Sequence, residues 1–180
     1  MFIPHLFLFL SLLLLSGCVP APHGGYYHPA TTQEGAEVHR RSCGGKVGPE
    51  DSLVIHQRGL TMRIRFERQE GGIRANIPIS VAGGAKLRVL PGAFVLEDLA
   101  GEGRAALRPQ TLMGAIRSGP IDEPVEGPAL RSLLLRVPEF SPTRFRLTFP
   151  PLEINGRVVT VAPVDFDYRA GEVGIYPLNC

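Results

Sequence analysis

The chain has 180 residues, of which 44% are hydrophobic and 20% are charged, and its formal net charge at pH 7 is +2. Such a balance excludes the strongly basic surface on which nucleic-acid binding depends, so no nucleic-acid partner is expected. The 21 glycines, the 17 prolines and the many short apolar segments favour an all-β domain with frequent turns.

An apolar run occupies residues 6–15 and consists almost only of Leu and Phe. Its length is about half of the ~20 residues that a membrane-spanning helix needs, and it fits the hydrophobic part of a secretory signal peptide. The run ends in Leu15-Ser16-Gly17-Cys18, where the two residues before the cysteine are small. Residues 1–17 are therefore expected to be a signal peptide.

The tetrapeptide LSGC, from Leu15 to Cys18, resembles the lipobox of bacterial lipoproteins. The resemblance implies that Cys18 becomes the new N-terminus and carries the lipid, and that more than one acyl chain anchors it stably. Val19 in place of Asp implies transfer to the outer membrane, facing the periplasm. The first residues, 1–5, depart from the usual signal because they contain no Lys or Arg. A plain secretory signal cut near Ala21 and an uncleaved anchor are the alternatives.

Two cysteines, Cys43 and Cys180, remain once Cys18 is assigned to the lipid. An exported protein meets an oxidising compartment, so these two are expected to form a disulfide, with two free thiols as the alternative. In the chain-entropy model a bridge that closes nearly the whole domain into one loop stabilises it by about 5 kcal/mol.

Residues 18–42 show no apolar periodicity and are rich in Pro, Gly, His and Thr. A segment of this kind buries too little apolar surface to offset the entropy of ordering it. We therefore expect a lipidated flexible tether over residues 18–42, followed by a single domain over residues 43–180. The tether histidines His23, His28 and His39 form either a weak metal site or, as we favour, part of a solvated linker.

From residue 53 onward, short apolar runs alternate with turns. Residues 60–67 alternate strictly between apolar and polar side chains, which predicts a half-buried strand with one solvated face. On that face Arg63 and Arg65 are either an anion site or, as we favour, ordinary surface charges. Residues 73–81 predict a second strand, and Pro78 within it indicates an edge position or a bulge.

Further strands are expected over residues 86–90 and 93–96, with weaker patterns over 104–107 and 111–116. The loop 118–128 contains three prolines, two glycines and three acidic residues, and it is the first candidate for an interaction surface. Residues 129–137 fit a short helix between two prolines and a strand equally well.

The C-terminal third has the clearest alternation, over residues 144–149 and 164–168. Between these two segments Asn155-Gly156 predicts a hairpin, because both residues tolerate positive φ. Short strands at regular spacing predict an antiparallel β-sandwich, immunoglobulin-like in architecture. The Cys–Trp–Cys signature of immunoglobulin domains is absent, since the chain has no Trp.

Few residues point to catalysis. His56 is the only histidine well inside the expected domain, so a histidine-dependent active site would have to use it. Asp165 and Asp167 share a strand face with carboxyl groups about 6–7 Å apart, which suits a calcium site or, less well, an acid–base pair. We favour a solvent-facing strand there, and we expect no cofactor.

The sequence therefore predicts a cell-envelope lipoprotein whose domain is a non-catalytic binding or structural module. Its partners would be the membrane, through Cys18, and another envelope protein or the cell wall. An envelope hydrolase that uses His56, Asp165 and Asp167, or a bound metal, is the alternative. A chaperone-like domain that offers an edge strand to a client is a third interpretation.

Overall fold

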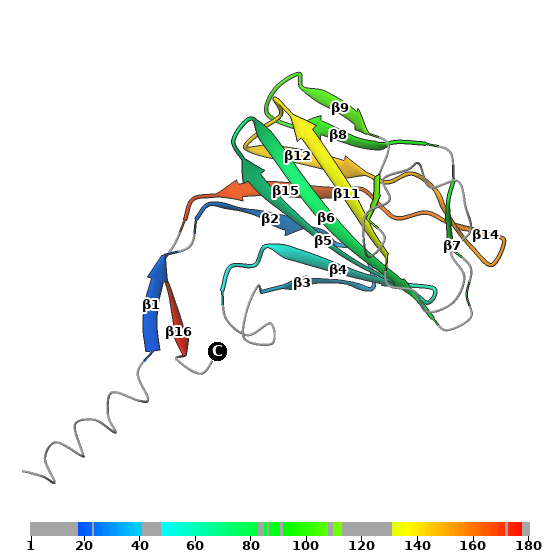
Figure 1. The fold of residues 1–180 in the computed structure, drawn as a ribbon, viewed down its shortest axis with the longest axis horizontal. Coiled ribbons are helices and arrows are strands. Elements are labelled where there is room, and N and C mark those ends of the chain that lie inside the picture. The colour runs from blue at the N-terminus through cyan, green and yellow to red at the C-terminus, as the bar shows by residue number, and fades with distance from the viewer. Residues whose placement is uncertain are drawn as a thin grey trace, which may run out of the picture.

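The structure, a computed structural model, consists of antiparallel strands, with no helix in the part of the chain that it describes. It describes residues 18–22, 24–40, 48–82, 85, 87–90, 92–107, 110–112, 131–171 and 173–177. Two large sheets face each other, a three-stranded sheet lies at one end, and a two-stranded ribbon lies at the other (Figure 1). The predicted all-β class and the antiparallel sandwich architecture are confirmed.

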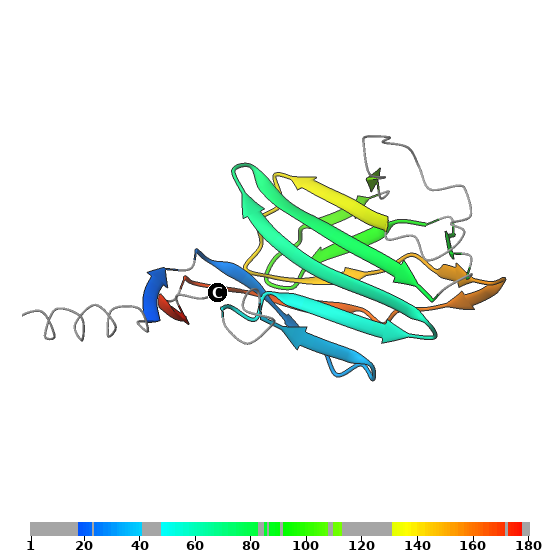
Figure 2. The same ribbon diagram turned by 60° about the horizontal axis from the view of Figure 1, so that its bottom comes forward.

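The larger sheet has six strands in the order β10-β11-β6-β5-β4-β3. Four of them, β3 to β6, follow one another both in the chain and in the sheet (Figure 2). The bounds are β3 (Ala36–His39), β4 (Ser52–Gln57), β5 (Leu60–Gln69), β6 (Gly72–Val81), β10 (Gln110–Leu112) and β11 (Arg131–Pro138).

The second sheet has five strands in the order β2-β15-β12-β8-β9. Their bounds are β2 (Tyr26–Ala30), β8 (Phe94–Asp98), β9 (Arg104–Leu107), β12 (Arg144–Thr148) and β15 (Val164–Arg169). The three-stranded sheet joins β7 (Leu87–Val89), β13 (Leu152–Ile154) and β14 (Arg157–Val159), and the ribbon joins β1 (Cys18–Pro22) and β16 (Val173–Pro177). The hairpin predicted at Asn155-Gly156 connects β13 to β14, with φ of 50° and 77° at these residues.

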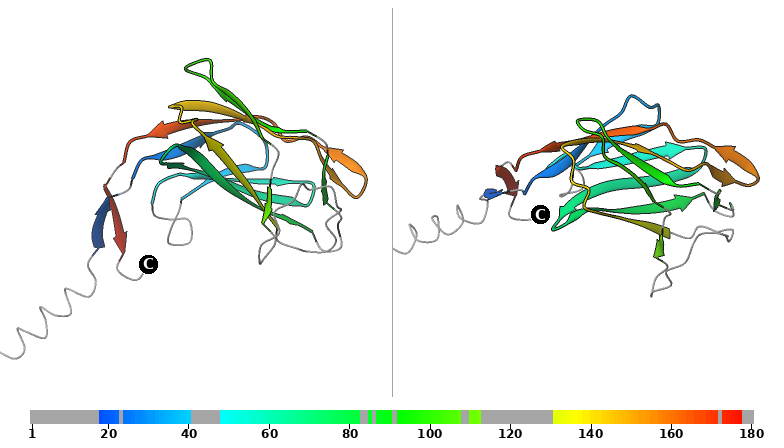
Figure 3. Two further views of the ribbon diagram at one scale, coloured as in Figure 1. Left: turned by 45° about the horizontal axis from the view of Figure 1, so that its top comes forward. Right: turned by 90° about the horizontal axis from the view of Figure 1, so that it is seen from above.

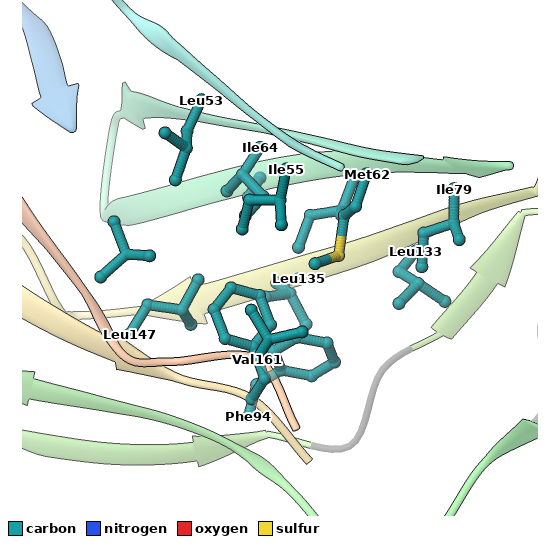
Figure 4. Close-up of a cluster of buried hydrophobic side chains, with 14 of the residues drawn as sticks. Leu53, Ile55, Met62, Ile64, Ile79, Phe94, Leu133, Leu135, Leu147 and Val161 are labelled. Carbon is teal, nitrogen blue, oxygen red and sulfur yellow. The ribbon is translucent and has the colours of Figure 1, made fainter. Parts of the chain in front are cut away.

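The core lies between the two large sheets (Figure 3). Strand periodicity puts alternate side chains on the inner face, so Leu60, Met62, Ile64 and Phe66 of β5 are each at most 1% exposed. Figure 4 shows side chains of both sheets pointing toward one another, with Ile64 and Met62 on one side and Leu147 and Phe94 on the other. Burial of this apolar surface is the main force that holds the sheets together.

Aromatic rings fill the part of the core nearest β2. Phe66 of β5 meets Phe145 and Phe166 of the opposite sheet edge-on, with ring centroids 4.9 and 5.0 Å apart. Phe145 and Phe166 stack on each other at 5.2 Å, and Tyr27 adds a further edge contact to Phe145 at 5.2 Å. Edge-to-face and offset pairs of this kind add about 0.5–1.5 kcal/mol each beyond the area that they bury.

The expectation of a flexible tether over residues 18–42 is wrong for the described residues of that segment. It contains β1, β2 and β3, and β2 and β3 are strands of the two large sheets. Tyr27 is fully buried, so the domain begins before Cys43. The segment carries no periodic pattern because each strand has only four or five residues. Its partners lie far along the chain, and cross-strand packing with them decides its conformation.

The position of Pro78 also differs from the prediction of an edge strand. Strand β6 lies between β5 and β11, so Pro78 is inside the sheet. Proline has no N–H to donate, and the ladder between β5 and β6 stops after Met62↔Ile79 and resumes at Arg65↔Asn76. On the other side Pro78 still pairs with Ser132 of β11. The sheet therefore tolerates the proline by a local gap in one ladder.

Residues 131–138 form strand β11, which excludes the helical alternative for the described part of 129–137. Leu133, Leu135 and Val137 are buried, whereas Arg136 is exposed. The run of leucines satisfied both the helical and the strand period. Its eight-residue pairing with β6 decides between them, because it gives the backbone groups on that side of the strand hydrogen-bond partners.

Candidate functional site

The predicted lipid-bearing residue begins the ribbon. In the ladder of β1 and β16, Cys18 lies opposite Pro177, and Pro22 lies opposite Val173. Pro22 and Val173 are the ends that continue toward β2 and β15 of the sandwich, so Cys18 is at the remote end of the ribbon (Figure 1).

Three sequence predictions lie outside the described residues. They are the signal peptide over 1–17, the disulfide between Cys43 and Cys180, and the interaction loop over 118–128. All three stay predictions.

The two aspartates proposed as weak metal ligands lie on β15, on the outer face of the five-stranded sheet. The guanidinium group of Arg146 donates two hydrogen bonds to Asp165, at 2.7 and 3.0 Å, and Arg144 lies 3.1 Å from Asp167. The bonds to Asp165 raise the pKa of Arg146 above its ordinary value. Among the described residues, no group of three or more His, Cys, Asp or Glu side chains is arranged to hold a metal ion.

His56 lies on β4, in the other sheet. Its neighbour Ile55 is fully buried, so the exposed His56 side chain is on the outer face, where Nδ1 is hydrogen-bonded to Thr61 Oγ1 at 3.1 Å. Asp165 and Asp167 are on the outer face of the opposite sheet, beyond the core. The structure does not bring these three residues together.

The described histidines of the segment 18–42 are also separate. His28 of β2 donates from Nδ1 to the carbonyl oxygen of Glu50 at 3.1 Å, and His39 of β3 lies 3.3 Å from the Glu37 carboxylate. The partner of His28 lies on the segment before β4, whereas the partner of His39 lies on its own strand, β3.

The outer face of the six-stranded sheet contains a polar pocket of about 270 Å³. Its lining comes from Arg40, which follows β3, and from the outward residues of three adjacent strands. The lining residues are Arg40, Ser52, Arg63, Arg65, Glu67, Arg74, Asn76 and Pro78. We call this feature the arginine pocket. Pro78 is its one apolar residue, whereas pockets for small organic molecules are predominantly apolar.

Ion pairs order part of the arginine pocket. The Glu67 carboxylate accepts hydrogen bonds from Arg65 and, at 3.0 Å, from Arg74. Partial burial raises the pKa of Glu67, but these two guanidinium groups outweigh it and hold the pKa below its ordinary value. Glu67 therefore stays ionised and fixes two arginines side by side.

The remaining two arginines are held differently. Arg40 donates to Glu50 Oε1 at 2.7 Å and to the carbonyl oxygen of Gly48 at 3.1 Å. Arg63 is exposed and has no carboxylate within 4 Å among the described residues. Arg74 lies opposite Arg136 of β11 in the ladder, which adds a fifth positive charge at the margin of the arginine pocket.

A wider groove of about 790 Å³ follows β2 and the segment that leads to β3. Its lining includes residues 29–33 with Val38, Ala162 and Pro163, and its titratable groups are His28, Arg146 and Asp165. Arg146 and Asp165 already satisfy each other there, so the groove offers no excess charge.

The sequence pattern allowed an anion site at Arg63 and Arg65 but favoured ordinary surface charges there, and it did not single out the other pocket residues. The signal for Arg74 and Glu67 was present: a two-residue turn at Glu70-Gly71 sets the hairpin register and places these two residues opposite each other. Arg40 gave no such signal, because β3 is short and lies in the segment expected to be a tether.

No family model matches the chain, and neither a curated protein nor a solved structure matches it. Within the residues that the structure describes, there is no helix of the length and apolarity that crossing a membrane requires.

Proposed function

We propose that the chain is a lipid-anchored protein of the bacterial cell envelope, attached through Cys18 to the outer membrane on its periplasmic side. The observation that carries the proposal is the motif Leu15-Ser16-Gly17-Cys18 directly after the apolar run of residues 6–15. The position of Cys18 at the remote end of the ribbon supports it, because acylation there leaves every strand of the sandwich in place.

The domain on this anchor is proposed to be a non-catalytic binding module. The residues that a hydrolase would need, His56, Asp165 and Asp167, lie on the outer faces of opposite sheets, and each has another partner. The residues that do converge are arginines on the six-stranded sheet, and their chemistry is the binding of anions. Binding to another envelope component is therefore the function that these contacts support best.

The ribbon gives the anchor a defined length. Five residues of extended chain span about 17 Å at ~3.4 Å per residue. The paired strands β1 and β16 hold the attachment point within that distance of the sandwich. A sandwich held in this way stays close to the membrane surface, with its ribbon end toward the lipid.

The test is metabolic labelling with radioactive palmitate in a bacterium that processes lipoproteins. Label is expected on the wild-type protein and on Cys43→Ala, which removes a cysteine outside the motif. Cys18→Ala is expected to carry no label and to leave the membrane fraction after cell disruption. Equal labelling of Cys18→Ala and wild type would refute the anchor.

A further inference from the structure

We infer that the arginine pocket binds a phosphate group, as a phosphomonoester on a small molecule or on a lipid headgroup. The juxtaposition that carries the inference is four guanidinium groups from Arg40, β5 and β6 around one pocket of about 270 Å³. This volume lies just below the range of about 300–1,000 Å³ for drug-sized ligands, so it suits a single small anionic group.

The charges in the arginine pocket are unbalanced. Its lining holds four arginines and one carboxylate, Glu67. Glu50 pairs with Arg40, and the buried Asp51 carboxylate accepts a hydrogen bond from the lining Ser52, so the arginines remain in excess of the nearby carboxylates. A phosphomonoester carries a charge of about −1.5 to −2 at pH 7, together with three strong acceptor oxygens. Bound there, it would neutralise the excess.

The arginines are arranged to share one anion. Glu67 holds Arg65 and Arg74 in place from one side, which reduces the entropy that a ligand must remove on binding. Arg63 lies one step further along the same face of β5 and is the guanidinium without a carboxylate among the described residues. A planar guanidinium group can donate two parallel N–H hydrogen bonds to the oxygens of one phosphate. We assign Arg63 as the primary contact of this kind.

Arg74 pairs with Glu67 on one side and faces a second arginine on the other. Arg74 and Arg136 lie directly opposite each other on β6 and β11, and like charges in that position are destabilising. An anion at the arginine pocket would relieve the repulsion, so the bound state is expected to unfold at a higher temperature than the free state.

Part of the arginine pocket lies toward the end of the sheet nearer the anchor, whereas Arg63 and Pro78 lie past the middle of their strands. Glu67 and Arg74 are close to the β5–β6 turn, which is at the same end of the sandwich as the β1–β16 ribbon in Figure 1 and Figure 2. If the chain is lipid-anchored as proposed above, membrane phosphates are near this surface. The chemistry of the pocket does not depend on the anchor, so the two proposals can fail separately.

The first experiment titrates the chain from residue 18 onward, with Cys18→Ser to prevent acylation, with glycerol phosphate and inorganic phosphate. This chain contains every described strand. Calorimetry is expected to give saturable binding with a Kd of about 1 mM or tighter. Arg63→Gln is expected to weaken binding about tenfold or more, because a charge-assisted contact is lost.

The matched control is Arg157→Gln, which makes the same charge change on β14 at the far end of the molecule. It is expected to bind phosphate as tightly as the unsubstituted chain.

Arg63 is exposed and unpaired among the described residues, so its replacement should leave the unfolding temperature of the free protein unchanged. Arg63→Lys keeps the charge but lacks the planar group. Its affinity for phosphate is expected to lie between that of the unsubstituted chain and that of Arg63→Gln. Absence of binding, or equal losses from Arg63→Gln and Arg157→Gln, would overturn the inference.

The second experiment identifies the source of the phosphate. Flotation compares vesicles of phosphatidylcholine with vesicles that also contain phosphatidic acid, whose headgroup is a phosphomonoester. Recovery with phosphatidic acid vesicles that falls with Arg63→Gln assigns the arginine pocket to a lipid headgroup. Binding of glycerol phosphate without vesicle recovery assigns it to a soluble phosphate ester. Binding of neither overturns the inference.

Discussion

Tyr27 shows how one side chain ties the N-terminal segment to the core. Its ring meets Phe145 and Tyr168 edge-on, and its hydroxyl group donates a hydrogen bond to the carbonyl oxygen of Pro142 at 2.9 Å. Burial raises the pKa of the hydroxyl group above its ordinary value of 10.0, and the smaller opposing effect of Arg68 does not cancel this. The phenol is therefore held neutral in the folded protein.

Tyr27→Phe is expected to lower the free energy of unfolding by about 1–2 kcal/mol at pH 8, because the buried Pro142 carbonyl loses its donor. Urea denaturation followed by circular dichroism measures the change. Tyr26→Phe is the control, since the Tyr26 hydroxyl group makes no hydrogen bond within the described residues. Its cost should stay within about 0.5 kcal/mol. Equal costs for the two variants would contradict the role of the Tyr27 hydrogen bond.

The same variant has a pH signature. Below pH 10 the phenol of Tyr27 is protonated in both the folded and the unfolded chain. Above pH 10 the unfolded chain releases the proton while the folded protein keeps it, so stability falls as the pH rises toward the folded pKa. The difference in unfolding free energy between wild type and Tyr27→Phe should therefore shrink between pH 10 and 11. A difference that stays constant would show that the folded pKa is not raised.

At the scale of the element, the turn between β5 and β6 depends on two glycines with different surroundings. Gly71 has φ of 79°, and a Cβ added there would have no neighbour within 4 Å. Gly72 has φ of 152°, and a Cβ there would lie 2.1 Å from the carbonyl oxygen of Val137. Strand β11 ends against this point, because Glu139 N–H donates to Gly71 O at 2.6 Å. Only Gly72 is therefore fixed by close backbone approach.

Gly72→Ala is expected to lower the free energy of unfolding by at least about 3 kcal/mol, from backbone strain together with the clash against β11. Gly71→Ala should cost only about 1–2 kcal/mol, the strain of a left-handed conformation. Thermal and urea unfolding of both variants test the difference. If Gly71→Ala proved as costly as Gly72→Ala, the approach of β11 would not be the cause.

Elements were predicted from sequence wherever a strand had a regular pattern or a specific turn. Strand β5 alternates over eight residues, and Asn155-Gly156 forms a hairpin turn with positive φ at both residues. Pairing order could not be read in this way. Pro78 lacks a hydrogen-bond donor in either position. Strand β6 is an inner strand because β11 pairs with it, and Ser132, the partner of Pro78 on β11, lies more than 50 residues later along the chain.

At the scale of the whole molecule, the N-terminal segment completes both sheets. Strand β2 pairs with β15 over five residues, and β3 pairs with β4 over four. Tyr26 and Tyr27 of β2 are both buried. The two large sheets therefore begin at Tyr26, while the β1–β16 ribbon lies outside them (Figure 1).

Two truncations separate these roles. A chain that begins at Gly24 loses β1 and is expected to keep cooperative unfolding, because the two large sheets remain complete. A chain that begins at Thr31 loses β2 with its two tyrosines, each worth about 3–5 kcal/mol, out of a total stability of about 5–15 kcal/mol. It is expected to lose cooperative thermal unfolding in circular dichroism. A flexible tether would predict no difference between the two chains.

The sequence alone determined the all-β class, most strands after residue 52, the lipobox motif and the outward face that carries Arg63 and Arg65. These depend on short-range patterns, such as the alternation of residues along one strand. Only the tertiary structure decided that residues 26–39 belong to the sheets, that β6 is an inner strand, and that Arg40 and Arg74 join Arg63 and Arg65. Those outcomes depend on pairing between segments that are distant in the chain. The stability of such a strand is set by packing against its partner strand, which the strand's own sequence does not reveal.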